Sequence, residues 1–233
     1  MNDGVEETFS RARKEGRRAL LEPEDENVCA NYGIPVADSW VTRTSEEASR
    51  KAQELGFPVV LKIISPDIIH KTEAGGVLAG IKDQDELKRG FEEIIENARN
   101  RVPSAAILGV LVQRMIPAGI EVIVGGFRDP QFGPTIMFGT GGIFAEVFKD
   151  AVFSLAPLEE SDAYYMIHSI KAYPLLRGYR NMPRVDEKAI ADILLNASRL
   201  ISDHPEIDQM DLNPVIADHQ KATVVDARII IRS

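Results

Sequence analysis

A lysine stands within an apolar run that predicts a buried strand. Lys62 interrupts the sequence VVLKII, and a buried ammonium group is costly unless it is paired. Two interpretations stay open. The lysine can extend to solvent from a strand at the edge of a sheet, or its ammonium group can meet an anionic ligand such as a phosphate.

A polar loop after this strand carries the second set of reactive residues. Residues 65–76, SPDIIHKTEAGG, place His70 among polar neighbours and end on Gly75 and Gly76. Glycines allow a positive φ or the close approach of a ligand to the backbone. A lone histidine is usually structural or solvated. Its place in a loop next to two glycines favours a functional role for His70.

Two further stretches suggest sites for anions and for a metal. Gly139, Gly141 and Gly142 in FGTGGIFAE expose backbone N–H groups of the kind that bind anions, although glycine turns between strands are common. Asp211 and Asn213 in DLNP alternate, so they share one face of a predicted strand. We expect Asp226 on the next strand, opposite them. Oxygen ligands of this kind suit Mg²⁺, and the alternative is an exposed polar strand end.

Composition and missing motifs exclude several classes of protein. The net charge of −9 disfavours general binding of nucleic acid. The single Cys excludes an intramolecular disulfide, and the 44% hydrophobic content is that of an ordinary globular chain. The sequence contains neither a P-loop motif nor a Rossmann glycine motif. It shows no signal peptide, so we expect a protein of the cytoplasm.

The pattern of apolar residues predicts an α+β chain with two lobes. One helical segment is expected over Phe9–Tyr32, with a charged face exposed to solvent or, alternatively, used for docking. Strand, helix, strand, loop, strand and helix follow up to Arg101. After them come consecutive strands, expected to form an antiparallel sheet, two helices, and two final strands joined at Asp218–Gln220. We place the lobes at residues 1–115 and 116–233.

Taken together, these residues resemble a known family. The strand lysine, the sequence VQRMIPAGIE, the glycine-rich GTGGIFAE, and the DLNP and VDA motifs are similar to the ATP-grasp fold, in which two α+β lobes hold ATP between them. The HKTEAGGV sequence is more specific. It resembles the β subunit of the ADP-forming acetyl-CoA synthetases, which are relatives of succinyl-CoA synthetase, and the resemblance covers about Leu21 to Arg228.

The resemblance implies a role for each candidate residue. Lys62 would contact the nucleotide phosphates, Gln113, Met115 and Ile116 would lie in the hinge that receives adenine, and Glu121 would bind the ribose. Among the remaining residues, Gly141 and Gly142 would bind the nucleotide through their backbone, and Asn213 and Asp226 would bind Mg²⁺. His70 and Asp211 would be catalytic. His70 matches a transiently phosphorylated histidine, and Asp211 stands where the succinyl-CoA synthetases have a glutamate.

The resemblance also implies a reaction and a partner. A phosphoryl group would pass from a phosphohistidine on an α subunit to His70 and then to ADP, giving ATP. The CoA-binding domain and the first phosphohistidine are expected on that α subunit, in an α2β2 assembly. Two alternatives stay open: a regulatory or acetyltransferase-associated ATP-grasp domain, and a nucleotide-binding subunit without catalysis, which would have no need for His70.

Overall fold

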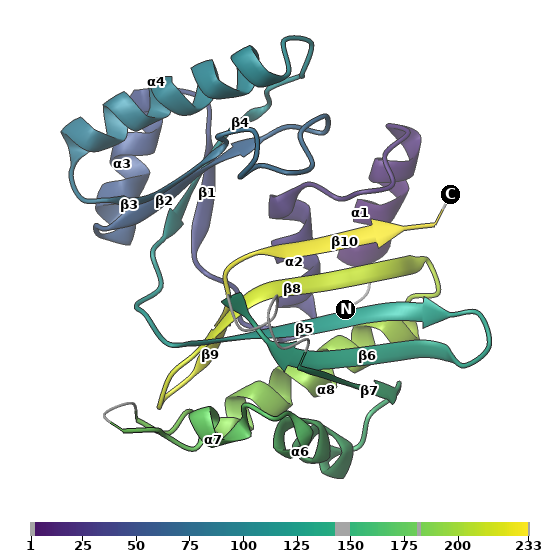
Figure 1. The fold of residues 1–233 in the computed structure, drawn as a ribbon. Coiled ribbons are helices and arrows are strands. Elements are labelled where there is room, and N and C mark those ends of the chain that lie inside the picture. Colours follow the sequence, from purple (N-terminus) through teal and green to yellow (C-terminus); the bar gives the residue numbers. More distant parts are fainter. Residues whose placement is uncertain (1–2, 143–149, 181–182, 233) are drawn as a thin grey trace. The chain divides into compact units, whose positions relative to one another are not determined.

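The chain forms two compact units in a computed structural model that describes residues 3–142, 150–180 and 183–232 (Figure 1). The larger unit comprises Met1–Val36 and Pro117–Ser233, and the smaller unit comprises Ala37–Ile116. The expected division placed residues 1–36 with the first lobe. The structure differs here, because apolar side chains of this segment, including Val5, Phe9 and Val28, are buried in the core of the larger unit.

The smaller unit is a four-stranded antiparallel sheet covered by two helices. Its elements are β1 (Ser39–Thr42), α3 (Ser45–Leu55), β2 (Val59–Ile64), β3 (Val77–Ile81), α4 (Gln84–Arg101) and β4 (Gly109–Arg114). The strand order is β1-β4-β2-β3. This confirms the predicted alternation of strands and helices. Thr44 caps α3 by accepting a hydrogen bond from the Glu47 N–H at 3.2 Å.

Alternation along β2 decides which of its side chains face the helices. Leu61 and Ile63 pack in the core with residues of α3 and α4 such as Ala52 and Leu87. Because successive strand residues point to opposite faces, Lys62 lies on the other face of this sheet. The helices α3 and α4 therefore pack on one face of the sheet, and Lys62 lies on the face that they do not cover.

The larger unit is built on a six-stranded antiparallel sheet. Its strands are β5 (Ile120–Asp129), β6 (Gly133–Thr140), β7 (Ala151–Leu155), β8 (Ile207–Ala217), β9 (Ala222–Val224) and β10 (Ala227–Ile231). The order is β10-β8-β5-β6-β7, with β9 also paired to β8. The expected antiparallel pairing of the consecutive strands is thus confirmed for β5, β6 and β7, whereas β4 belongs to the other sheet.

Helices cover one face of this sheet. They are α6 (Glu160–Ser169), α7 (Tyr173–Leu176) and α8 (Glu187–Asp203) (Figure 1). The amphipathic α8 buries Ile193, Leu194 and Ala197 against sheet residues that include Val122 and Val124. The intervening residues of β5, such as Glu121, therefore lie on the opposite face of the sheet.

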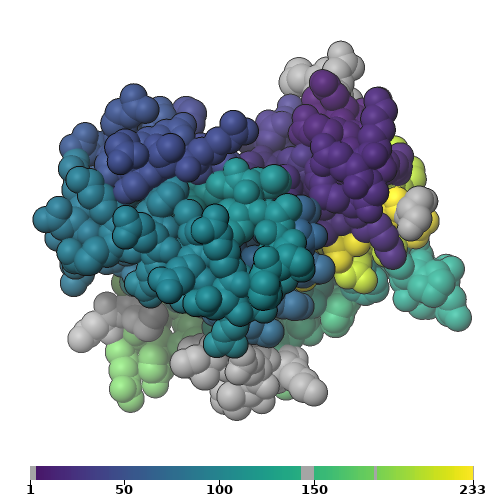
Figure 2. All heavy atoms as spheres, turned by 90° about the horizontal axis from the view of Figure 1, so that it is seen from above, coloured from purple at the N-terminus to yellow at the C-terminus, as the bar shows by residue number. Residues whose placement is uncertain are grey.

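The N-terminal segment forms two helices instead of the one expected over Phe9–Tyr32. These are α1 (Asp3–Lys14) and α2 (Glu22–Asn31), and the residues between them run beside the last strand, β10 (Figures 1 and 2). The Leu20 N–H donates to the Ile229 carbonyl at 3.1 Å, and the Ile231 N–H donates to the Arg18 carbonyl at 2.8 Å. This segment therefore covers backbone groups of β10 that would otherwise form an open sheet edge.

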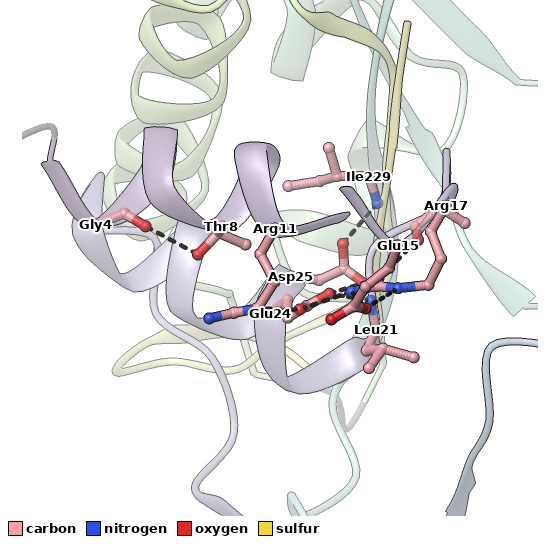
Figure 3. Close-up of polar contacts among 10 residues, drawn as sticks. Gly4, Thr8, Arg11, Glu15, Arg17, Leu21, Glu24, Asp25 and Ile229 are labelled. Atoms are coloured by element: carbon pink, nitrogen blue, oxygen red, sulfur yellow. Dashed lines mark hydrogen bonds and ion pairs between the residues drawn. The ribbon is translucent and has the colours of Figure 1, made fainter. Parts of the chain in front are cut away.

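A cluster of charges holds the two N-terminal helices together (Figure 3). Glu24 accepts hydrogen bonds from Arg17 at 2.8 Å, Arg11 at 3.1 Å and the Leu21 N–H at 2.9 Å. Its side chain is 10% exposed. The expectation of a solvated charged face is therefore wrong for Arg17, whose side chain is 11% exposed, whereas Arg11 pairs with Glu24 but stays 50% exposed.

We expect Glu24→Gln to lower the free energy of unfolding by about 1.5–3 kcal/mol, because hydrogen bonds to a charged group are lost. Burial alone would raise the pKa of Glu24, but the hydrogen bonds from Arg17, Leu21 and Arg11 outweigh it and lower the pKa. The stabilisation is therefore present above the usual glutamate pKa of about 4.3 and is lost as the pH falls through the lower folded value. Urea titrations at pH 7 and near pH 3 measure both effects.

The control for this prediction is Glu15→Gln. Glu15 pairs with the same Arg17 at 2.8 Å, but its side chain is 51% exposed, so the change should cost no more than about 0.5 kcal/mol. Equal losses in the two variants at pH 7 would contradict the special role of Glu24.

Candidate functional site

The smaller unit gathers two predicted site residues on one face of its sheet. Lys62 pairs with Leu111 of β4, and Gln113 pairs with Val60 of β2, so all four side chains share the face that the helices leave uncovered. Lys62 is 4% exposed and Gln113 is 1% exposed. A buried cation beside a buried amide can bind the phosphate and the polar edge of one ligand.

The chain leaves this sheet through Met115 and Ile116. Met115 is exposed and Ile116 is buried, while the Met115 N–H donates to the Pro58 carbonyl at 3.3 Å. The next residue, Pro117, begins the larger unit again. These two residues therefore lie in a connection between units, as expected of a hinge.

His70 lies in the loop that joins β2 to β3. Ile68 and Ala74 anchor this loop because both are buried in the core of the smaller unit. Between them His70 is exposed, and its carbonyl accepts a hydrogen bond from the Ala74 N–H at 3.2 Å. The loop is thus anchored on both sides of His70, while the imidazole is exposed to solvent.

The local structure explains why glycine occurs at both positions, 75 and 76, that close the His70 loop. Gly75 has a φ of +64°, and a Cβ at Gly76 would lie 2.5 Å from the Ile63 Cγ2 atom. A turn and close packing therefore explain this pair without any ligand, which removes one of the arguments that favoured a site at His70. The exposed position of the histidine remains.

In the larger unit, Glu121 meets the glycine-rich segment. The Gly141 N–H donates to the Glu121 carbonyl at 2.8 Å, and a Cβ at Gly142 would lie 2.7 Å from the Glu121 Oε2 atom. Gly142 also has a φ of +60°. The structure therefore brings Glu121, Gly141 and Gly142 together, and a side chain at position 142 would force the Glu121 carboxylate to move. The rest of the predicted motif, residues 143–146, lies outside the described residues.

The three predicted metal-site residues lie at and beside the middle of β8. Asp211 pairs with Gly125 of β5 and with Arg228 of β10. Beyond it, the Asn213 N–H donates to the Asp226 carbonyl at 2.9 Å. We expected Asp226 within a continuous last strand, but it lies in the bend between β9 and β10. Its position opposite Asn213 is as expected.

Asp211 has an unusual electrostatic environment for an exposed residue. Desolvation of the carboxyl group by surrounding atoms raises the pKa of Asp211, while Arg228 and a hydrogen bond from Asn213 offset part of this effect. Arg228 is a site residue that our sequence analysis missed, although Asp226 and Arg228 interrupt an apolar strand with the same period of two.

The donor set fits a cation that is shared with an anionic ligand. In the part of the chain that the structure describes, no group of three or more His, Cys, Asp or Glu side chains could hold a metal by itself. Asp211 and Asp226 supply two carboxylates and Asn213 supplies an amide oxygen. Such hard oxygen donors suit Mg²⁺, which usually keeps waters and takes further ligands from substrate phosphates.

Each of the two units therefore carries one part of the predicted site. The sheet face of the smaller unit holds Lys62 and Gln113, with His70 on the adjoining loop. The larger unit carries the remaining residues on the sheet face away from α8: Glu121 on β5, Gly141 and Gly142 after β6, and Asp211, Asn213 and Asp226 at β8 and the bend after β9. None of the described helices is long and apolar enough to cross a membrane.

A family model described as an ATP-grasp domain matches residues 11–231, which establishes the class of the fold. The chain is 48% identical to the acetate–CoA ligase [ADP-forming] I subunit beta of Pyrococcus furiosus, over 97% of each chain. It therefore belongs to the ATP-grasp family of β subunits of ADP-forming acetyl-CoA synthetases, which are acid–thiol ligases.

Solved structures agree with this assignment. The dinucleotide forming acetyl-coenzyme A synthetase 1 of Ca. Korarchaeum cryptofilum, in complex with coenzyme A, Ca-AMPCP and HgCl⁺, matches with a TM-score of 0.95 and 48% identity. The match covers 98% of this chain and 100% of that one. A second structure of that protein, with coenzyme A and Mg-AMPPCP, has its phosphohistidine segment pointing towards the nucleotide binding site. It matches with a TM-score of 0.87 and 46% identity, over 98% of this chain and 100% of that one.

Proposed function

We propose that this chain is the nucleotide-binding subunit that transfers a phosphoryl group between a partner α subunit and ADP. One observation carries the proposal: a glycine cradle against Glu121 and the oxygen donors Asp211, Asn213 and Asp226 share one sheet face in a member of this family. Backbone N–H groups on such a face can donate hydrogen bonds to a nucleotide, and the oxygen donors can bind the nucleotide phosphates through a metal ion. When bound, Mg²⁺ would neutralise phosphate charge.

The chain's own residues have distinct roles in this proposal. Lys62 neutralises the nucleotide phosphates, and Gln113, Met115 and Ile116 receive the adenine. Glu121 binds the ribose, and Gly142 donates a backbone hydrogen bond, while Gly141, whose N–H is bonded to the Glu121 carbonyl, holds the glycine segment against Glu121. Asn213 and Asp226 would hold the Mg²⁺, and Asp211 is a catalytic group beside them. Positioning and charge stabilisation supply most of the catalysis in phosphoryl transfer.

His70 acts as a covalent carrier in the proposed reaction. An imidazole nitrogen of His70 attacks the phosphorus of the phosphohistidine on the α subunit; the old P–N bond breaks and a new one forms. A terminal phosphate oxygen of ADP then attacks the same phosphorus. The P–N bond to His70 breaks, a P–O bond forms, and ATP and free histidine result. An exposed histidine on a loop suits both encounters.

A second mechanism has support from the Korarchaeum protein, whose phosphohistidine segment is seen pointing towards the nucleotide binding site. A segment that reaches the nucleotide can deliver the phosphoryl group directly. His70 would then only position that group, and its loss would slow the reaction without stopping it. The α2β2 stoichiometry and the location in the cytoplasm remain predictions.

The purified chain should bind Mg-ADP but form no ATP from acetyl-CoA, phosphate and ADP until an α subunit is added. The reason is that none of the proposed roles includes binding of the acyl-CoA. Calorimetry with Mg-ADP and a coupled assay for ATP, with and without the α subunit, measure the two properties. Robust turnover by the isolated chain would contradict the proposed function.

Gly142→Ala should weaken Mg-ADP binding roughly tenfold or more. The new Cβ would lie 2.7 Å from the Glu121 Oε2 atom and would displace the carboxylate. The matched control is Gly133→Ala, because Gly133 also has a positive φ but its Cβ would meet nothing within 4 Å. Both variants carry the backbone strain of about 1–2 kcal/mol, and only Gly142→Ala should lose nucleotide affinity. Equal affinities by calorimetry would remove Glu121 from the nucleotide site.

A further inference from the structure

The turn that carries His70 is closed by its own backbone hydrogen bonds. The Ala74 N–H donates to the His70 carbonyl at 3.2 Å. The Gly76 N–H donates to the Lys71 carbonyl at 2.7 Å. Residues 70–76 therefore form one local unit, and the position of the imidazole depends on the contacts that hold this unit on the rest of the chain.

Asp67 holds the loop on the side that precedes His70. Its Oδ2 atom accepts a hydrogen bond from the Ala106 N–H at 2.7 Å, and this bond spans 39 residues of sequence. Its own N–H donates to the Oγ atom of Ser65, which is buried, at 3.1 Å. The carboxylate thus ties the loop to the connection between α4 and β4, and the serine hydroxyl ties it to the end of β2.

Asn97 holds the loop on the side that follows His70. It lies on α4, and its Nδ2 atom donates to the Gly75 carbonyl at 3.3 Å. The contact is close, because a Cβ at Gly75 would lie 3.2 Å from the Asn97 Cβ atom. The two side-chain bonds therefore lead to one support, which is α4 together with the connection that follows it.

These two bonds define the direction of the loop rather than its attachment to the core. Ile68 and Ala74 are buried and attach the loop by apolar contacts, which are non-directional. Asp67 is exposed and Asn97 is half-buried, so each adds little to global stability. Hydrogen bonds have strict geometry, and loop regions open locally at low free energy. Loss of either bond should therefore let the turn reorient while the core persists.

We propose that Asp67 and Asn97 are positioning residues for His70. The inference rests on the proposed function, in which His70 carries or positions the phosphoryl group. Phosphoryl transfer depends on alignment of the attacking and leaving atoms, and a displacement of about 1 Å can cost roughly a hundredfold in rate. Asp67 acts only as an acceptor and Asn97 acts as a donor. The two positions should therefore differ in their tolerance of an exchange between Asp and Asn.

Exchange of the two side-chain types is the test. Asp67→Asn keeps an oxygen acceptor for the Ala106 N–H, so its kcat for ATP formation with the α subunit should stay within about twofold of the wild-type value, whereas Asp67→Ala should lower kcat roughly tenfold. Asn97→Asp keeps the shape of the side chain but loses the donor to the Gly75 carbonyl, so it should also lower kcat roughly tenfold. The KM and the Kd for Mg-ADP should be unchanged.

Hydrogen exchange of the full chain gives a readout that is independent of turnover. The Ala74 and Gly76 amides are bonded within the turn. We expect both amides to exchange faster in Asp67→Ala and in Asn97→Asp than in the wild-type chain, because the turn then opens more often. Asp67→Asn should retain wild-type exchange at both amides.

Two control variants separate positioning from a general loss of stability. Asn100→Asp makes the same change at an exposed position of α4 and should leave kcat unchanged. Asp83→Ala removes a carboxylate that accepts the Glu86 N–H at 2.8 Å at the start of the same helix. It should lower the Tm and yet leave kcat and the exchange of the turn at their wild-type values.

The outcomes distinguish this inference from the proposed function. Wild-type kcat in both Asp67→Ala and Asn97→Asp would overturn the positioning role alone, and so would an equal loss of kcat in Asp83→Ala. Equal losses in Asp67→Asn and Asp67→Ala would overturn the role of Asp67 as an acceptor. A wild-type chain that forms no ATP with the α subunit would contradict the proposed function, and this inference with it.

Discussion

His70→Ala should abolish ATP formation from acetyl-CoA, phosphate and ADP, while labelled phosphate accumulates on the α subunit. The loss follows because His70 is the phosphoryl carrier in the proposed reaction, and a phosphothreonine at Thr72 would be too stable to pass its group on. Nucleotide binding should persist, because Lys62 and the sheet of the larger unit are untouched. The measurement combines a coupled assay for ATP with tracing of ³²P on the two chains.

His70→Ala should remove the imidazole without changing the structure of the loop. The His70 side chain is exposed, and the hydrogen bond in which the residue takes part uses its backbone carbonyl, so alanine should preserve the loop. Thr72→Ala, at another exposed position of the same loop, is the control and should retain activity. Residual turnover of about 1–10% in His70→Ala, the range typical of a lost supporting contact, would reject the covalent relay in favour of direct delivery.

Asp226→Asn should raise the Mg²⁺ concentration required for activity and lower activity at limiting Mg²⁺ by roughly a hundredfold or more. Loss of a residue that only supports a metal ligand typically costs about 10–100-fold, and Asp226 is proposed as a ligand itself. The Asp226 carbonyl that accepts the Asn213 N–H is part of the backbone, so the local structure should persist. Calorimetry of ADP binding at a series of Mg²⁺ concentrations gives a readout that is independent of turnover.

Asp192→Asn is the matched control for the metal. It makes the same change of charge in the same unit, on the exposed face of α8, where Asp192 pairs with Lys188. Its Mg²⁺ dependence should equal that of the wild-type chain. If Asp226→Asn leaves the Mg²⁺ titration unchanged as well, the assignment of the metal site is wrong.

The sequence allowed prediction of the fold wherever periodicity was strong and contacts were local. The helix at Asp83–Arg101 carries its apolar residues at helical spacing, and Asp83 caps it by accepting the Glu86 N–H at 2.8 Å. The β2 strand was predicted because its residues are apolar apart from Lys62. In such segments propensity, pattern and capping agree.

Prediction failed where distant residues decide the structure. The break between α1 and α2 is imposed by pairing of Leu20 with Ile229, which local sequence does not reveal. Arg17 was expected on a solvated face because its partner, Glu24, lies beyond that break. In the same way, the bend at Asp226 depends on how β9 and β10 both pair with β8, and the pattern TVVDARIII indicated one strand.

The candidate site was predictable in part for a similar reason. Asp211 and Asn213 alternate on one strand, so their shared face follows from spacing alone. The contact of Glu121 with Gly142 joins β5 to the residues that follow β6 and could be expected only from the resemblance. Arg228 was missed because a cation in a half-buried strand position is ordinary until its cross-strand partner, Asp211, is known.

The covering of β10 by the N-terminal segment has a consequence for synthesis on the ribosome. The bond from the Ile229 N–H to the Asp25 carboxylate spans 204 residues, so at about 5–20 residues per second the helix waits roughly 10–40 s for its partner strand to be made. During that interval Val28 and Phe9 lack their final core. The smaller unit, Ala37–Ile116, is continuous in sequence and can fold first. The two ends of the chain then close the larger unit in the last step, which makes that closure the stage most exposed to aggregation.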